Sequence, residues 1–275
     1  MQDSRLTGHK NAPDVLAQHP LRYAAAGMVD RLLGRLRRLT YKNSSRVHMQ
    51  RVNEAFARSV PAGARVLDAG AGSCPYRELF DHAVYESADL QGVDKPYGEI
   101  TYCCDLRNIP VEDGTFDFIL FNQTLEHMAE PQAALKELAR VLKPGGRLLC
   151  TAPLFYEEHE APHDYFRFTQ FAHRYLFEEA GFEIERLEWL EGYLGTLAHQ
   201  LDRAAIALPY HASAYGLGAS RWLMPPTAVS IKLLFTLLSG LMSRLDARHR
   251  FTDAGYPKNY VVVARRLPEP ATPAT

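Results

Sequence analysis

The stretch Arg65-Val66-Leu67-Asp68-Ala69-Gly70-Ala71-Gly72-Ser73-Cys74-Pro75-Tyr76 decides the fold of this chain. It opens with a compact apolar run, broken only by Asp68, which predicts a short buried strand. Gly70 and Gly72 allow a tight turn and let a ligand approach the backbone closely. The following residues 73–75 supply an N-cap residue and a proline suited to a first helical turn. A strand, a glycine turn and a helix start together predict a nucleotide-binding loop.

The same loop indicates which nucleotide it binds. A dinucleotide fingerprint needs a third glycine three residues after the second, and this chain has Pro75 there. Asp68 would repel a pyrophosphate, whereas a buried carboxylate can accept hydrogen bonds from an ammonium group. S-adenosylmethionine carries an ammonium group and no phosphate. The loop therefore favours S-adenosylmethionine over NAD, and a tight turn that binds no ligand is the alternative.

Length and composition narrow the class of protein. The chain has 275 residues, of which 47% are hydrophobic, and a formal net charge of −1. It is long enough for one large domain with additions, and its charge gives no sign of nucleic-acid binding. The first residues lack a signal-peptide core, and the four cysteines lack metal-ligand spacing or a disulfide framework. We therefore expect a cytoplasmic protein without a nucleic-acid partner.

Two stretches resemble a known family. Residues 66–72 look like the first motif of class I S-adenosylmethionine-dependent methyltransferases, although Cys74 replaces the third alternating glycine of many members. The stretch ALKELARVLKPGGRLL, residues 134–149, is similar to the type 11-like branch that methylates small molecules. The resemblance covers about residues 60–190 and the last strand. It implies a bacterial enzyme with an α/β, Rossmann-like sheet of seven mostly parallel strands and helices on both faces.

Polar residues after successive strands are candidates for the cofactor. Asp89 ends the second predicted strand, 21 residues after Asp68, where an acid can accept both ribose hydroxyl hydrogen bonds. Glu86 competes for this role because strand ends are uncertain, and an ordinary turn acid is the alternative. The resemblance places Asp105 and the amide of Leu106 at the adenine. The predicted cofactor-binding residues are Asp68, Gly70, Gly72, Asp89, Asp105, Leu106, Asn122 and Gln123, the last two facing the sulfonium.

Histidines on the acceptor side are candidates for catalysis. His127 follows the fourth strand, and the stretch HDYFRFT, residues 163–169, resembles a substrate loop of bacterial family members. His127, His163 and His159 are the candidate proton acceptors, and Tyr165 and Arg167 are candidate substrate contacts. These side chains could instead serve only to fix the loop. The four-residue spacing of two histidines would suit a metal on a helix, but Pro162 lies between them and no third ligand is apparent, so no metal is predicted.

The remaining segments predict added helices. Residues 1–60 form an N-terminal helical cap, with helices over 13–38 and 45–59. Residues 61–190 and 259–266 form the cofactor-binding domain, and residues 267–275 a disordered tail. A helical insertion, 191–258, precedes the last strand and contains helices over 194–208 and 228–245. The second is apolar nearly all round but shorter than the roughly 20 residues of a membrane span.

These observations predict an S-adenosyl-L-methionine-dependent methyltransferase. An alcohol acceptor must lose a proton, and nearby histidines suit that role, so O-methylation of a small-molecule, glycan or lipid-linked acceptor is the first expectation. The alternatives are C- or N-methylation, a non-catalytic binding protein with the same fold, and an NAD-dependent oxidoreductase. Residues 228–245 could pack on the chain's own core, form a homodimer, or hold the protein at the inner membrane surface.

Overall fold

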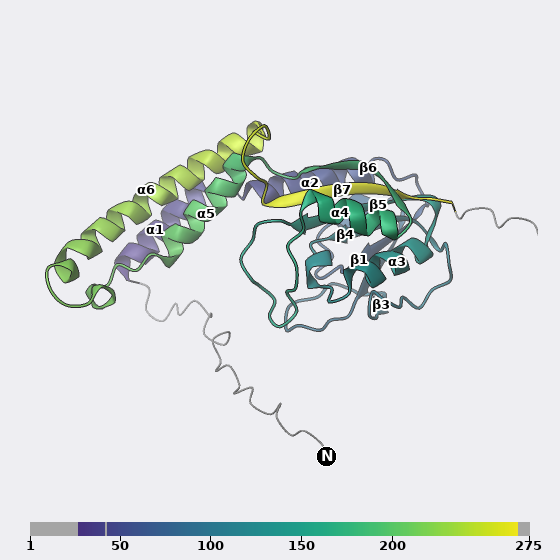
Figure 1. Cartoon of the computed structure of the whole chain (residues 1–275), viewed down its shortest axis with the longest axis horizontal. Helices are drawn as coiled ribbons and strands as arrows, with labels where there is room; N and C mark the ends of the chain where they lie inside the picture. The colour runs from purple at the N-terminus through teal and green to yellow at the C-terminus, as the bar shows by residue number, and fades with distance from the viewer. Residues whose placement is uncertain (1–26, 42, 269–275) are drawn as a thin grey trace, which may run out of the picture.

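The computed structural model describes residues 27–41 and 43–268, which form a sheet domain and an elongated helical arm (Figure 1). The predicted helix over residues 13–38 begins outside the described residues. Most of the predicted tail, residues 267–275, also lies outside them. The first described helix, α1, spans Met28–Thr40 and belongs to the arm. The N-terminal segment is therefore divided between the arm and the sheet domain.

The sheet has seven strands in the order β3-β2-β1-β4-β5-β7-β6. All neighbouring pairs are parallel except those of β7, which runs antiparallel to both β5 and β6. This confirms the predicted mostly parallel sheet. The strands are β1 (Arg65–Ala69), β2 (Val84–Asp89), β3 (Tyr102–Cys103), β4 (Phe116–Asn122), β5 (Leu142–Pro153), β6 (Phe182–Trp189) and β7 (Asn259–Arg266).

Helices cover both faces of the sheet. Helices α3 (Pro131–Val141) and α4 (Gln170–Glu179) pack on one face, where Leu138 and Phe177 are fully buried. Helix α2 (Ser44–Ala57) packs on the other face through Phe56. The hydroxyl of Thr169 accepts a hydrogen bond from the Ala172 amide and so caps the start of α4.

The glycine loop does not lead into an α-helix, contrary to the expectation. Only a 3-10 turn, η2 (Arg77–Phe80), follows it, and the residue before that turn is Tyr76 rather than an N-cap at 73 or 74. Gly72 and Cys74 both have positive φ, +52° and +53°, which no right-handed helix accommodates. The Cys74 amide closes a tight turn on the Ala71 carbonyl. The loop therefore offers turn amides rather than a helix terminus to a ligand.

The insertion forms two long helices of the arm. Helix α5 spans Tyr193–Ala207, as predicted, and α6 spans Ser220–Arg248, beginning eight residues earlier than expected. Pro225 and Pro226 lie within its first two turns, although prolines usually interrupt a helix. A short 3-10 turn, η4 (Ala212–Tyr215), connects the two helices.

Buried polar contacts hold the arm together. Arg37 of α1 donates two hydrogen bonds to the carboxylate of Asp202 on α5, at 2.5 and 2.8 Å. The Lys232 ammonium of α6 donates to the Ile206 and Leu208 carbonyls at the end of α5, at 3.2 and 2.7 Å. These bonds therefore hold the three helices of the arm to one another.

Candidate functional site

The strand order reverses direction between β1 and β4, which lie side by side in the sheet. In open α/β sheets, ligands bind at the carboxyl ends of the strands at such a point. A cavity of about 300 Å³ lies there. Its wall is built from residues that follow β1, β2, β3, β4 and β5, so each strand delivers one segment to a common site.

The cavity brings together most of the predicted cofactor residues. Gly70, Asp89, Asp105, Leu106 and Gln123 line it. The other three predicted cofactor residues do not line the cavity: Asp68, Gly72 and Asn122. The side chain of Asn122 instead donates to Asn53 of α2 and accepts from Thr151 of β5.

Asp68 is buried beneath the loop at the end of β1. Its carboxylate accepts a hydrogen bond of 2.5 Å from the Tyr85 hydroxyl of β2. Burial raises the pKa of Asp68 to about 6, even though the Tyr85 hydrogen bond acts in the opposite direction. A neutral phenol compensates a buried charge less well than a cation does, so an ammonium group would stabilise this carboxylate further.

Asp89 joins the end of β2 to the glycine loop. One carboxylate oxygen accepts from the Gly72 amide at 2.9 Å, and the other accepts from the Gln91 amide at 2.8 Å. The competing acid, Glu86, does not line the cavity and is bound by Arg65 at 2.7 Å. Of the two predicted ribose acids, Asp89 is therefore the one in a position to meet a ligand.

Asp105 lies in the cavity wall but is held by a cation that sequence reasoning missed. The guanidinium of Arg107 donates to both oxygens of Asp105, the shortest bond being 2.7 Å. These hydrogen bonds lower the pKa of Asp105. Arg107 also lines the cavity and pairs with Glu130. A ligand amine at Asp105 would share the carboxylate with this guanidinium.

The histidine candidates gather on the side of the cavity formed by the loop after β5. His127 and His163 both line it, together with Tyr165. The Nδ1 atom of His127 lies 2.6 Å from the His163 carbonyl oxygen, and the Nδ1 atom of His163 lies 3.1 Å from the Tyr165 hydroxyl. Burial lowers the pKa of His127. His159 does not line the cavity, but its ring packs edge-on against that of His127.

Arg167, a predicted substrate contact, lies behind the cavity wall. It donates to both oxygens of Asp164 and to the carbonyls of Tyr156 and Glu157. Burial would raise the pKa of Asp164, but the Arg167 hydrogen bonds outweigh it and lower that pKa to about 2. In this structure Arg167 fixes the loop.

A second ion pair that the sequence did not reveal lies in the cavity wall. Lys95, in the connection after β2, donates to the Glu160 carboxylate at 2.8 Å, and both residues line the cavity. The pair joins two loops that are 65 residues apart in the chain. No periodic pattern marks either residue, so only the folded structure identifies them.

Substituting Gly70 with Ala is expected to damage the loop severely. Its φ is +74°, and an added Cβ would lie 2.2 Å from the Thr124 hydroxyl oxygen. Backbone strain and the clash together should lower the free energy of unfolding by about 2–5 kcal/mol. Gly72→Ala is the matched control, because its added Cβ meets nothing within 4 Å. Equal losses for the two variants in denaturant unfolding would contradict the packing argument.

Comparison with known proteins now adds to this geometry. Residues 67–150 match the family model described as a methyltransferase domain. This segment is therefore similar to methyltransferase domains of the type 11-like group. The match runs from β1 to β5, and so contains the glycine loop, the strand ends and Gln123, while the arm lies outside it.

Relatives of the methyltransferase domain cover only part of the chain. An uncharacterized 37.1 kDa protein in transposon TN4556 of Streptomyces fradiae is 33% identical over 98 residues, which are 36% of this chain and 26% of that protein. Demethylmenaquinone methyltransferase of Staphylococcus haemolyticus is 28% identical over 152 residues, 48% of this chain and 61% of the relative. The chain thus spans less than two thirds of either relative.

The [4+2]-cyclase SpnF aligns with a TM-score of 0.49 and 21% identity, over 79% of this chain and 80% of that one.

Proposed function

We propose that this protein transfers a methyl group from S-adenosyl-L-methionine to a small-molecule or lipid-linked acceptor. The observation that supports the proposal most strongly is the cavity at the switch point between β1 and β4, within the matched methyltransferase domain. Its wall carries Asp89 for a ribose and Asp105 with Leu106 for an adenine, and Asp68 is buried beneath the adjoining loop. The relative from Staphylococcus haemolyticus is named as a methyltransferase, which agrees with the proposal.

Each part of the cofactor would meet a different strand end. Asp68 would accept the ammonium group, and Asp89 would accept the ribose hydroxyls while it keeps the Gly72 amide. Asp105 and the amide of Leu106 would bind the adenine, and Gln123 would face the sulfonium. The predicted contact from Asn122 is not proposed, because its side chain is bound to Asn53 and Thr151. This order places the methyl group towards the loop after β5, where His163 and Tyr165 lie.

We propose O-methylation with His163 as the proton acceptor. The acceptor oxygen would form a bond to the methyl carbon as the carbon–sulfur bond breaks, and S-adenosylhomocysteine would leave with the electron pair. The acceptor proton would pass to the imidazole of His163. Much of the rate can come from placing the oxygen in line behind the methyl group. His127 and His159 are the other candidates, and C- or N-methylation or binding without turnover are the alternative functions.

An assay with labelled S-adenosylmethionine and a bacterial extract tests this function. We expect label to enter one acceptor, and mass analysis of the product to show a methyl ether. Label on carbon or nitrogen would replace O-methylation with one of the alternatives. Cofactor binding without any transfer to extract or membrane lipids would favour a non-catalytic binding protein.

The arm supports a contact with a membrane surface. Helix α6 has the length and composition to cross a membrane, and 33% of its most apolar window is buried. Its buried face is polar, whereas its exposed face is apolar, which reverses the pattern of a helix on a water-soluble core. The buried polar side chains are Lys232, Thr236, Ser239, Ser243 and Asp246. The exposed apolar ones include Trp222, Leu223, Leu234, Leu237 and Leu241.

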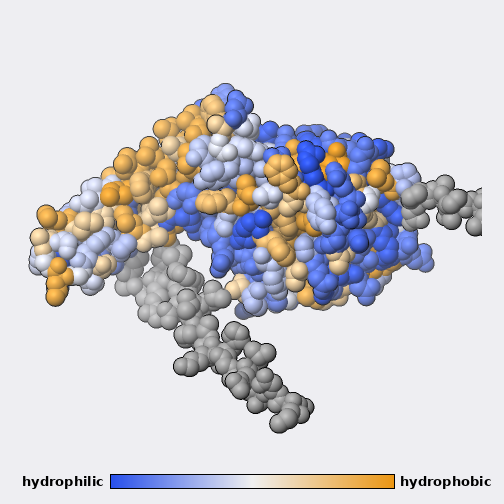
Figure 2. Space-filling view, in the orientation of Figure 1, coloured by the Kyte–Doolittle hydropathy of each residue, from blue (hydrophilic) through white to orange (hydrophobic). Residues whose placement is uncertain are grey.

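The arm exposes many apolar side chains to solvent. Figure 2 shows a hydrophobic surface over the outer side of α6. Helix α1, which is also part of the arm, exposes Met28, Leu32 and Leu39. An apolar helix face of this kind lies in the interface of a lipid bilayer or is covered by another subunit. We propose the inner membrane surface as its partner, because a lipid-linked acceptor would be delivered there.

Vesicle sedimentation tests the membrane contact. The wild-type chain should sediment with vesicles of phosphatidylcholine and phosphatidylglycerol. Replacing Leu234, Leu237 and Leu241 with Gln should weaken binding at least about tenfold, because burial of each leucine contributes on the order of 1.5–3 kcal/mol. Lys136→Gln on α3, away from the arm, is the control. A wild-type chain that stays in the supernatant as a stable dimer would favour the homodimer through residues 228–245.

A further inference from the structure

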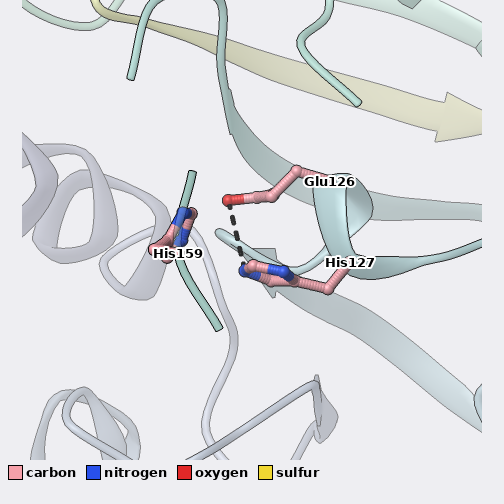
Figure 3. A group of neighbouring side chains, drawn as sticks. All are labelled: Glu126, His127 and His159. Carbon is pink, nitrogen blue, oxygen red and sulfur yellow. Dashed lines mark ion pairs between the residues drawn. The ribbon is translucent and has the colours of Figure 1, made fainter. Parts of the chain in front are cut away.

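Three side chains converge next to the cavity. One ligand atom each from Glu126, His127 and His159 lies within 4.8 Å of the other two. Figure 3 shows these side chains pointing towards one another from two segments. Glu126 and His127 belong to the 3-10 turn η3 (Leu125–His127) after β4, whereas His159 comes from the loop after β5. In the sequence, His159 and His163 had no apparent third ligand. In the folded chain, His159 lies instead beside Glu126 and His127.

The Glu126 carboxylate requires a partner that the described residues do not provide. Its side chain is fully buried, and neither oxygen has a hydrogen-bond partner among those residues. The Nε2 atom of His127 lies 3.9 Å from Oε1 of Glu126, beyond hydrogen-bond distance. Buried charges in proteins are paired or bound to metals, and otherwise take up a proton. A cation or a proton must therefore occupy this position.

Both histidines are oriented as metal ligands usually are. The Nδ1 atom of His127 faces the His163 carbonyl oxygen at 2.6 Å. The Nδ1 atom of His159 faces the Glu157 carbonyl oxygen and a carboxylate oxygen of Asp164, each at 3.3 Å. When Nδ1 carries the proton, Nε2 keeps a free lone pair, and such outer hydrogen bonds fix metal-binding imidazoles.

We propose that Glu126, His127 and His159 bind a divalent transition-metal ion, with zinc as the best match. Two imidazole nitrogens and one carboxylate suit zinc better than calcium or magnesium, which prefer oxygen ligands. Tetrahedral zinc would bring the three ligand atoms to roughly 3.3 Å from one another. Metal binding would therefore draw the Glu126 and His127 atoms together from 3.9 Å as well as bring His159 closer.

The ion would lie at the acceptor side of the cavity. His127 is part of the cavity wall, and Glu160, whose carboxylate lies 4.0 Å from Nε2 of His127, lines it too. Three protein ligands leave a fourth position for water or for an oxygen of the acceptor. Metal binding itself does not depend on methyl transfer, so it can be tested even if the proposed reaction is wrong.

The test uses the full-length chain after removal of metal with a chelator. Zinc, titrated against a chromophoric competitor, should bind with one equivalent per chain, and cobalt should give a visible spectrum of tetrahedral type. Saturating zinc should raise the Tm by about 5–10 °C at a concentration 100 times the Kd. His159→Asn and Glu126→Gln should each weaken zinc binding at least about tenfold.

His163→Asn is the matched control, since it removes a histidine of the same loop that is outside the cluster. It should bind zinc as the wild type does. The Tm of His159→Asn should no longer rise with zinc. Because this variant keeps the buried Glu126, it tests the site even if Glu126→Gln fails to fold. The proposal is overturned if the wild type shows no saturable binding, or if both cluster variants bind zinc unchanged. In that case a proton occupies Glu126, and Glu126→Gln should raise the Tm without metal.

Discussion

Asp68→Ala is expected to abolish S-adenosylmethionine binding while the domain stays folded. The carboxylate is buried and is bound by the neutral hydroxyl of Tyr85, so the cofactor ammonium would be its first cationic partner. Loss of a buried charge pair typically costs 2–5 kcal/mol, which corresponds to roughly 30- to 5,000-fold weaker binding. Calorimetry should therefore detect no binding at micromolar cofactor.

Stability and pH separate this result from simple misfolding. Removing a buried, poorly compensated carboxylate should leave the Tm near that of the wild type. The pKa of Asp68 is raised to about 6 by burial, so the empty protein gains stability from its proton as the pH falls from about 6 towards 4. Cofactor binding needs the ionised form, and affinity should fall below pH 6. Glu86→Gln, an acid of β2 outside the cavity, is the control.

A different result would change the assignment of the loop. Tight binding by Asp68→Ala, with an affinity within about threefold of the wild type, would show that Asp68 is only structural. Tyr85→Phe offers a second measurement, because loss of its hydrogen bond should raise the pKa of Asp68 further. The pH at which cofactor affinity falls should then be higher in Tyr85→Phe than in the wild type. An unchanged pH midpoint would show that Tyr85 does not control the ionisation of Asp68 that binding requires.

His163→Asn should lower the rate of methyl transfer and leave cofactor binding intact. General-base catalysis typically contributes 10²- to 10⁴-fold, so kcat should fall by about that factor. His163 lines the cavity, and its Nδ1 atom contacts Tyr165, which orients the ring. The measurements are kcat with the acceptor found in the extract assay and the Kd for S-adenosylhomocysteine.

Two comparisons make the His163 prediction specific. His82→Asn is the control, since His82 is bound to the Val60 carbonyl and lies outside the cavity. Tyr165→Phe should lower kcat less than His163→Asn does, because it removes only the contact that orients the ring. A kcat for His163→Asn within about threefold of the wild type would instead indicate an acidic acceptor that needs no base, or His127 as the base.

The sheet could be predicted because its strands are short apolar runs with clear ends. The strand predicted before Gly70 matches β1, and the predicted insertion before Asn259 contains helices α5 and α6. The prediction was wrong where local signals compete with backbone geometry. Residues 73–75 look like a helix start, but the positive φ of Gly72 and Cys74 keeps the chain in turns.

The site could be predicted only to the level of strand ends. Asp89 ends β2 and Asp105 follows β3. Because these strands are parallel neighbours, their carboxyl ends lie at the same edge of the sheet, and both acids reach one cavity. Arg107 and Lys95 could not be found in this way, because their partners Asp105 and Glu160 depend on loop conformation. The Glu126 cluster was missed for the same reason, since two of its members are adjacent in sequence and the third lies in another loop.

Calorimetric titration of the wild-type chain with S-adenosylhomocysteine, beside NAD, tests the central claim most directly. We predict saturable binding of one S-adenosylhomocysteine per chain, which Asp68→Ala abolishes, and no binding of NAD. Saturable NAD binding, or no binding of S-adenosylhomocysteine by a folded wild-type chain, would contradict the assignment of the cavity to S-adenosylmethionine.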